Sequence, residues 1–331
     1  MNATMESVKH VSSIAELHEH IERNEPCVYH VPQESRLLCQ AKWTRDYLSE
    51  TVGSKAVTVR MSSSKKYIDP ADGFCSLVRA LLVHKMTMTE FFETGVPEGM
   101  IMSGTDTYLF HKGVPNPAWP KLWEDAKDLT ADASSSEDLG FVRQGTLHTV
   151  GLWVSGTGIK SILHYDDSGN NNLNFQIRGS KTIILFPPSD WPKLKTFAAV
   201  SLHDFSVYAD LIDQRGGKEN LGMLEGTHPV IVHLQENDVI YIPSRWYHYV
   251  KHEGDFNVNM TCWFKRETLS EDANYVNVET PGRSCSDWGV MIKMVSAFVV
   301  SSLLNYVRKI TGNRVSTPTG STESTRPGQH A

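Results

Sequence analysis

The stretch NLNFQIRGSKTIILFPP, residues 172–188, decides the fold class of this 331-residue chain. It contains two short runs rich in β-branched and aromatic residues, 173–177 and 182–186, separated by Gly179 and Ser180. Runs of this length and composition, bounded by turn residues, are typical of β-strands. We interpret the stretch as a β-hairpin in which Lys181 begins the returning strand.

Four more runs of the same kind follow further along the chain. They occupy residues 230–234, 239–242, 247–250 and 258–264. Glu236, Asn237 and Asp238 are expected to form a turn between the first two runs. Short strands at this spacing predict an antiparallel barrel or jelly roll rather than a sheet built from βαβ units. The predicted fold class is therefore α+β, with a double-stranded β-helix (jelly-roll) core and flanking N-terminal and C-terminal helices.

Segments with helical signals flank this core. Residues 13–16, SIAE, have the capping-box spacing ahead of an amphipathic run, and further short helices are expected near residues 44–48 and 87–92. We therefore expect four parts, which are an N-terminal α/β region packing on the barrel (1–105), the jelly-roll domain (106–267), a C-terminal helical region (268–312) and a disordered tail rich in Ser, Thr, Gly and Pro (313–331).

Composition limits the classes of function. The formal net charge is -6 and the sequence pI is about 6.2, so no global positive field favours binding to phosphates. The five cysteines are scattered, odd in number and free of CxxC spacing, which is typical of reduced thiols. Because the first residues also lack the pattern of a signal peptide, we expect a cytoplasmic and/or nuclear location.

One apolar segment lies near the C-terminus. Residues 294–307 carry no charge, but they are fewer than the roughly 20 apolar residues that a membrane-spanning helix needs. We expect no stable membrane insertion, and we expect residues 288–307 to form an amphipathic helix that docks on the fold or joins two copies in a homodimer. A tail anchor is the alternative, because Arg308, Lys309 and a polar tail follow.

Residues 161–166, SILHYD, contain the first candidate metal ligands. His164 and Asp166 are two residues apart at the end of an expected strand, so both side chains lie on one face. Two histidines and one carboxylate bind non-haem Fe(II) on one face of an octahedron and leave the other positions open. His248 is the best second histidine, because a turn, a buried strand and a proline at residue 243 precede it in NDVIYIPSRWYH, residues 237–248.

The His-x-Asp pair alone is a weak signal. On the order of one such pair is expected by chance in a chain with 14 histidines. Histidines outside the pattern are expected on the surface or in local hydrogen bonds, and they include His148, His203, His228, His233 and His252. The setting strengthens the pair, because a lysine such as Lys181 inside a barrel mouth requires an anion there. A dicarboxylate cosubstrate would supply that anion.

Taken together, these segments resemble the JmjC, or cupin-like, 2-oxoglutarate oxygenases. The resemblance rests on residues 164–166 (HYD), 176–181 (QIRGSK), 185–188 (LFPP), 238–243 (DVIYIP) and 246–248 (WYH), and it covers residue 108 to about residue 265. Within that family the chain is most similar to the small JmjC-only hydroxylases. These include the asparaginyl hydroxylase that acts on hypoxia-inducible factor and the tRNA wybutosine-synthesising hydroxylase.

The resemblance implies a role for each matching residue. It assigns Fe(II) to His164, Asp166 and His248, and the distal carboxylate of 2-oxoglutarate to Lys181. The remaining positions that it places around the cosubstrate are Tyr108, whose hydroxyl would help to hold that carboxylate, together with Ser161, Asn172 and Thr261. For Tyr108 the alternative is a core aromatic residue.

The resemblance also implies a reaction. We expect an Fe(II)- and 2-oxoglutarate-dependent dioxygenase that uses molecular oxygen to hydroxylate a protein side chain. Hydroxylation of a modified tRNA base is the alternative, supported by an N-terminal similarity at residues 42–49 and 52–55 and by the local cations Arg60, Lys65 and Lys66. A catalytically inert JmjC binding module and a cupin isomerase or sugar-binding jelly roll are further alternatives, and the absence of zinc-finger spacing disfavours histone demethylation.

Overall fold

The computed structural model describes residues 6–61, 83–131, 140–143, 146–166, 170–194 and 225–265. The predicted C-terminal helical region, its dimer helix and the tail, residues 268–331, lie outside these ranges and stay predictions. Among the residues that are described, no helix is long and apolar enough to cross a bilayer.

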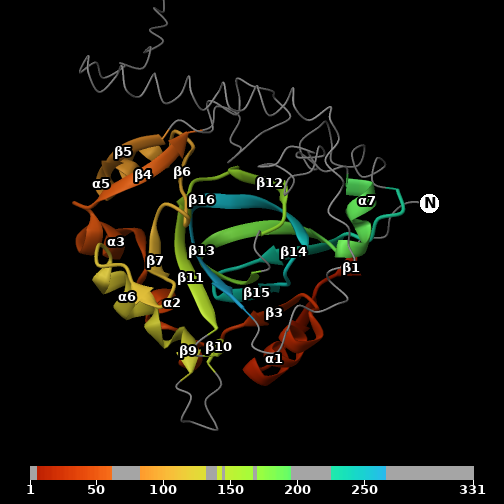
Figure 1. Ribbon diagram of the computed structural model, residues 1–331. Coiled ribbons are helices and arrows are strands. Elements are labelled where there is room, and N and C mark those ends of the chain that lie inside the picture. The colour runs from red at the N-terminus through yellow and green to blue at the C-terminus, as the bar shows by residue number, and fades with distance from the viewer. Residues whose placement is uncertain are drawn as a thin grey trace, which may run out of the picture.

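The described chain forms an extensive β-structure with short helices around it (Figure 1). The helices are α1 (Ile14–Arg23), α2 (Leu38–Lys42), α3 (Arg45–Val52), α5 (Met88–Glu90), α6 (Pro120–Ala126) and α7 (Trp191–Leu194). The strands of the first half are β1 (Glu6–Ser7), β2 (Lys9–Val11), β3 (Cys27–His30), β4 (Ala56–Met61), β5 (Val83–Thr87), β6 (Met100–Met102), β7 (Tyr108–His111), β8 (Val114–Pro115) and β9 (Thr130–Ala131). Those of the second half are β10 (Val142–Arg143), β11 (Leu147–Ser155), β12 (Lys160–His164), β13 (Asn171–Phe186), β14 (Val230–Leu234), β15 (Asp238–Ile242) and β16 (Tyr247–Phe264).

Two long antiparallel strands, β13 and β16, organise the core. The first half of β13 pairs with β15 and with the second half of β16, as in the partners Leu173 and Cys262. Its second half pairs with β14 and with the first half of β16, as in the partners Ile183 and Val250. Strand β12 lies on the other side of this first half of β16. The two strands therefore run through both layers of a jelly roll, and the cupin fold predicted from sequence is confirmed.

The predicted hairpin at Gly179 and Ser180 is wrong. Residues 173–177 and 182–186 do not pair with each other, because they belong to the single strand β13. Gly179 has a φ of 74°, so the chain bends here without reversing. The bend of β16 packs against it, since a Cβ atom on Gly179 would lie 2.6 Å from Oδ1 of Asn257. Lys181 thus continues the strand into the second layer.

The two bends also keep the same face of each strand directed inward. Before the bend in β13, even-numbered residues such as Asn172 line a cavity inside the barrel. After the bend, odd-numbered residues such as Lys181 line the same cavity. Strand β16 changes in the same way, from His248 to Thr261. The register between β13 and β16 shifts where the two bends meet, between residues 176 and 180 of β13 and residues 253 and 259 of β16. An irregularity of this kind exchanges the even-numbered and odd-numbered residues that face inward. Without it, the inward-facing residues of half of each strand would point away from the cavity.

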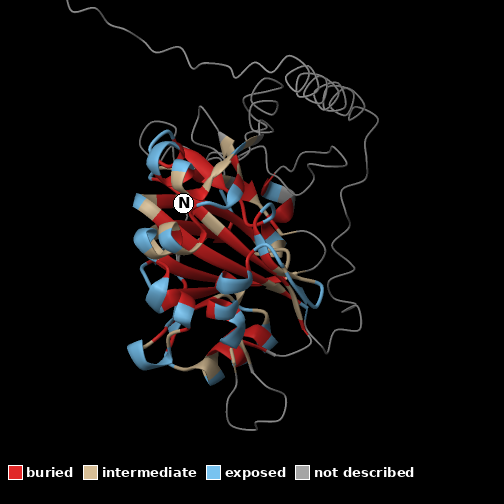
Figure 2. Ribbon diagram, turned by 90° about the vertical axis from the view of Figure 1, so that its left-hand side faces the viewer, coloured by how far each residue is buried: buried red, intermediate tan, exposed pale blue. Residues whose placement is uncertain are grey.

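The N-terminal segments extend this structure. Strand β3 pairs with β15, and β6 joins β4 to β11, so the core sheet continues into the first hundred residues. Helix α1 begins where the sequence predicts, with the hydroxyl of Ser13 accepting a hydrogen bond of 3.1 Å from the Glu16 amide. Helices α1, α2, α3 and α6 lie outside the strands, and Figure 2 shows buried residues concentrated in the strands and exposed residues on the helices.

We predict that Gly179→Ala destabilises the fold by about 2–4 kcal/mol, because the new methyl group adds both positive-φ strain and a clash with the β16 bend. Gly113→Ala is the matched control, since Gly113 has a φ of 85° and open space around it. It should cost only the strain, about 1 kcal/mol. Chemical denaturation of both variants gives the two values, and equal losses would contradict the close packing of the bends.

Candidate metal centre

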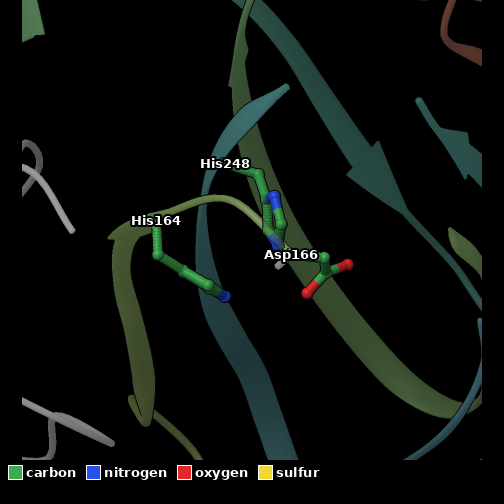
Figure 3. A group of neighbouring side chains, drawn as sticks. All are labelled: His164, Asp166 and His248. Atoms are coloured by element: carbon green, nitrogen blue, oxygen red, sulfur yellow. The ribbon is translucent and has the colours of Figure 1, made fainter. Parts of the chain in front are cut away.

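The three predicted metal ligands converge at one end of the barrel. His164 ends β12 and lies opposite His248, the second residue of β16, with their ring centroids 4.3 Å apart. Asp166 follows His164 by two residues, and one ligand atom from each of the three side chains lies within 4.8 Å of the others. In Figure 3 the two imidazoles and the carboxylate point toward one another. Within the part of the chain that the structure describes, this is the one group of three or more potential ligands.

Two hydrogen bonds orient these ligands. Nδ1 of His248 lies 3.1 Å from the carbonyl oxygen of Trp246. Because a carbonyl only accepts, Nδ1 must carry the proton, and Nε2 keeps the lone pair that a metal needs. Asn172 donates a hydrogen bond of 2.8 Å to Oδ2 of Asp166, which fixes the carboxylate. Contacts of this type typically raise metal affinity about 10- to 100-fold.

A buried lysine lies in the same cavity. We use the term metal cavity for the space lined by His164, Asp166, His248 and Lys181. Lys181 is 2% exposed, and burial lowers its pKa to about 7. Its ammonium group donates to Oδ1 of Asn174, and among the described residues no carboxylate forms an ion pair with it. A buried cation without a nearby negative charge is costly, so the cavity favours an anion at this point.

The donor set and the lysine fit an Fe(II) ion with a dicarboxylate. Two imidazole nitrogens and one carboxylate oxygen form the facial set that leaves coordination positions open. The lysine lines the same cavity as the three ligands, so the far carboxylate of a bound dicarboxylate could balance its charge. A site for structural zinc would instead be closed by a fourth ligand, and the described residues bring none to these three.

The other predicted residues separate into two groups. Ser161, Asn172 and Thr261 line the metal cavity, and their contact with a cosubstrate stays a prediction. Tyr108 lies elsewhere, because its side chain is 38% exposed and lines a second, wider cavity. The structure therefore does not place Tyr108 beside Lys181.

The wider cavity adjoins the metal cavity. Its volume is about 440 Å³, compared with about 60 Å³ for the metal cavity, and Asp166 and Trp263 line both. Its wall includes His111 and His148, whose Nδ1 atoms lie 2.8 and 3.0 Å from the hydroxyl of Thr149. Burial, followed by the charge of His111, lowers the pKa of His148. This cavity is the space from which a large substrate could reach a metal at Asp166.

Sequence reasoning missed several residues of the metal cavity. Asn174 connects Lys181 to Thr261, donating a hydrogen bond of 2.8 Å to the Thr261 hydroxyl, and Asn259 lines the same wall. For His252 the sequence predicts a surface position or a local hydrogen bond. The residue is buried, its Nδ1 lies 3.0 Å from the Ser155 hydroxyl, and it also lines the metal cavity. The alternation of side chains along a strand could have indicated two of them. Asn174 follows Asn172 by two residues and His252 follows His248 by four, so each pair shares one face of its strand.

Two other histidines make local contacts of the kind that the sequence predicts. His228 lies 2.9 Å from a carboxylate oxygen of Asp190, and His233 lies 2.9 Å from the hydroxyl of Thr182. His203 lies outside the described residues.

A comparison with protein families agrees with this geometry. The model of the cupin-like domain matches residues 13–270, which include both layers of the barrel and all three candidate ligands. The chain belongs to this cupin-like, JmjC-type family. The match begins at residue 13, so it also includes most of the N-terminal region that extends the sheet of this cupin-like protein.

Curated relatives share part of their length with this cupin-like chain. HSPB1-associated protein 1 is 28% identical over 232 residues in Bos taurus and 27% identical over 230 residues in Homo sapiens, covering 68% of this chain and 45% of each relative. The tRNA wybutosine-synthesizing protein 4 of Emericella nidulans is 27% identical over 230 residues, covering 69% of this chain and 20% of the relative. The chain thus spans less than half the length of these relatives.

We predict that Asn172→Ala weakens metal binding about 10- to 100-fold, because it releases the Asp166 carboxylate from its hydrogen bond. Asn174→Ala is the matched control, since Asn174 lies two residues away on the same face but contacts Lys181 and Thr261 instead of a ligand. Its metal affinity should equal that of the wild type. Calorimetric titration with Mn(II) measures both, and equal weakening by the two variants would exclude a specific role for Asn172.

Proposed function

We propose that this protein is an Fe(II)- and 2-oxoglutarate-dependent dioxygenase that hydroxylates a protein side chain. The observation that carries the proposal is the approach of His164, Asp166 and His248 to within 4.8 Å of one another, in the cavity that also contains the buried ammonium of Lys181. Membership of the cupin-like, JmjC-type family supports it.

Each residue of the cavity would have a defined task. His164, Asp166 and His248 would hold Fe(II), and Lys181 would bind the distal carboxylate of 2-oxoglutarate. When bound, these two groups supply the oxidative decarboxylation of 2-oxoglutarate to succinate and carbon dioxide, coupled to the transfer of one oxygen atom from O2 to a C–H bond. The protein contributes ligation, orientation and exclusion of water.

The surroundings of the ligands support this division of tasks. Asn172 holds the Asp166 carboxylate, and the Trp246 carbonyl sets the tautomer of His248. Lys181, Asn172 and Thr261 are each no more than 4% exposed, so the cosubstrate would be largely enclosed. The wider cavity would admit the substrate on the side of Asp166 and Trp263, and no acid or base residue is required there.

The choice of a protein substrate rests on charge. The net charge of -6 gives no general attraction to nucleic acid. Of the three cations that suggested an RNA surface, Arg60 forms an ion pair with Asp106 at 2.8 Å. Lys65 and Lys66 lie outside the described residues. A relative whose name refers to a protein partner, HSPB1-associated protein 1, is consistent with this choice.

Hydroxylation of a modified tRNA base is the second candidate. Relatives named for tRNA wybutosine synthesis support it, and so do the ring side chains Tyr108, His111 and His148 along the wider cavity. Aromatic and imidazole rings can stack on a nucleobase. The exposed Lys112 and Lys265 lie close enough to lower the pKa of His148, so the same cavity also has positive charge at its edge.

We predict that the purified protein with Fe(II) converts 2-oxoglutarate slowly to succinate without substrate, and that Asp166→Ala abolishes this conversion by removing the carboxylate ligand. Asp106→Ala is the matched control, because Asp106 forms a surface ion pair with Arg60. Its conversion rate should match the wild type. Succinate is measured by mass spectrometry, and a wild-type protein that binds iron without turnover would favour the inert binding module.

The same assay separates the two substrate classes. Peptide pools and bulk tRNA are added in parallel, and the coupled substrate should raise succinate release well above the basal rate. Stimulation by peptides supports the first candidate, and stimulation by tRNA alone replaces it with the second.

A further inference from the structure

The metal cavity contains a second nitrogen base beside Lys181. His252 lies directly opposite Lys181 in the antiparallel pairing of β16 with β13. Side chains of directly opposed residues lie on one face with Cβ atoms about 4.5–5.5 Å apart. Both residues line the metal cavity, and they are 4% and 2% exposed. A group bound by the Lys181 ammonium is therefore within reach of the His252 ring.

The backbone and one hydroxyl group hold His252 in place. Its amide donates to the carbonyl of Ile159 at 2.8 Å, and its own carbonyl accepts from the amide of Gly158 at 2.9 Å. Nδ1 of the ring lies 3.0 Å from the buried hydroxyl of Ser155. Because Nδ1 is engaged there, Nε2 is the ring atom that remains for a ligand in the cavity.

We propose that His252 is a binding residue for the distal carboxylate of 2-oxoglutarate, donating a hydrogen bond from Nε2 next to Lys181. This inference rests on the proposed function, because it concerns the cosubstrate of the same site. It gives His252 the position that the family resemblance assigned to Tyr108, whose side chain lines the wider cavity instead.

The chemistry of the pair suits one carboxylate. Burial, followed by the charge of Lys181, lowers the pKa of His252 to about 3, so the imidazole is neutral at physiological pH. A neutral ring can accept from the Ser155 hydroxyl at Nδ1 and donate from Nε2. The carboxylate would then receive one charged and one neutral donor without a second buried cation. Two donors at a fixed distance also distinguish a dicarboxylate from a 2-oxo acid that lacks the distal group.

The neighbouring side chains agree with this assignment. Asn174 and Asn259 line the same cavity and are uncharged. The Lys181 ammonium donates a hydrogen bond to Oδ1 of the Asn174 side chain. An incoming carboxylate can replace this weak neutral acceptor with a charged one, which binds an ammonium more strongly. Asn174 would keep its hydrogen bond to Thr261.

The test compares two ligands on three proteins. Anaerobic calorimetry with the Fe(II)-loaded full chain measures the Kd of 2-oxoglutarate and of 2-oxopentanoate, in which a methyl group replaces the distal carboxylate. His252→Leu should weaken 2-oxoglutarate binding about 10- to 100-fold and leave the Kd of 2-oxopentanoate unchanged. His233→Leu is the matched control, since His233 is an exposed histidine on β14, which pairs with the Lys181 strand β13, and it should change neither Kd.

Other outcomes overturn the inference. Equal weakening for both ligands, or unchanged binding of 2-oxoglutarate, would remove His252 from the carboxylate. If His252→Leu does not fold, as judged by its thermal unfolding, Ser155→Ala replaces it, because it frees Nδ1 and should weaken only 2-oxoglutarate, roughly 3- to 10-fold. No effect of Ser155→Ala would then overturn the proposal. A wild-type protein that binds Fe(II) but not 2-oxoglutarate would instead contradict the proposed function itself.

Discussion

The antiparallel pairing of β13 with β16 is the constraint on which the rest of the structure depends. It holds from residue 171 opposite residue 264 to residue 186 opposite residue 247, across both layers of the barrel. Each strand bends once, and each bend reverses the parity of the residues that face inward. The metal ligand His248 and the buried Lys181 therefore share one cavity with Asn172 and Thr261, although they lie in different layers.

This pairing also explains the electrostatics of the site. A lysine that faces the interior of a two-layer barrel loses its hydration, and burial accordingly lowers the pKa of Lys181. Within the described ranges its acceptor is neutral, Oδ1 of Asn174, and no carboxylate forms an ion pair with it. A site of this kind keeps its affinity for an external anion, because an internal salt bridge would compete with it.

The sequence predicts the ligands better than their surroundings. His164, Asp166 and His248 follow from local signals, namely a strand that ends in His-x-Asp and a turn, strand and proline before the second histidine. The hairpin at Gly179 was predicted wrongly because a glycine between two β-runs marks a bend as well as a reversal, and the partner strand decides which one forms. The place of Tyr108 depends on the long-range register of β7 against β11, which no local pattern contains. Even spacing puts His252 on the face of His248, but only the pairing of β16 with β13 places it opposite Lys181.

The most direct test of the account is a crystal structure of the protein grown anaerobically with Mn(II), as a substitute for Fe(II), and 2-oxoglutarate. The account predicts one metal ion bonded to His164, Asp166 and His248, with the distal carboxylate of 2-oxoglutarate in contact with the Lys181 ammonium. A metal ion bound elsewhere, or a dicarboxylate that leaves Lys181 without an anion, would contradict it.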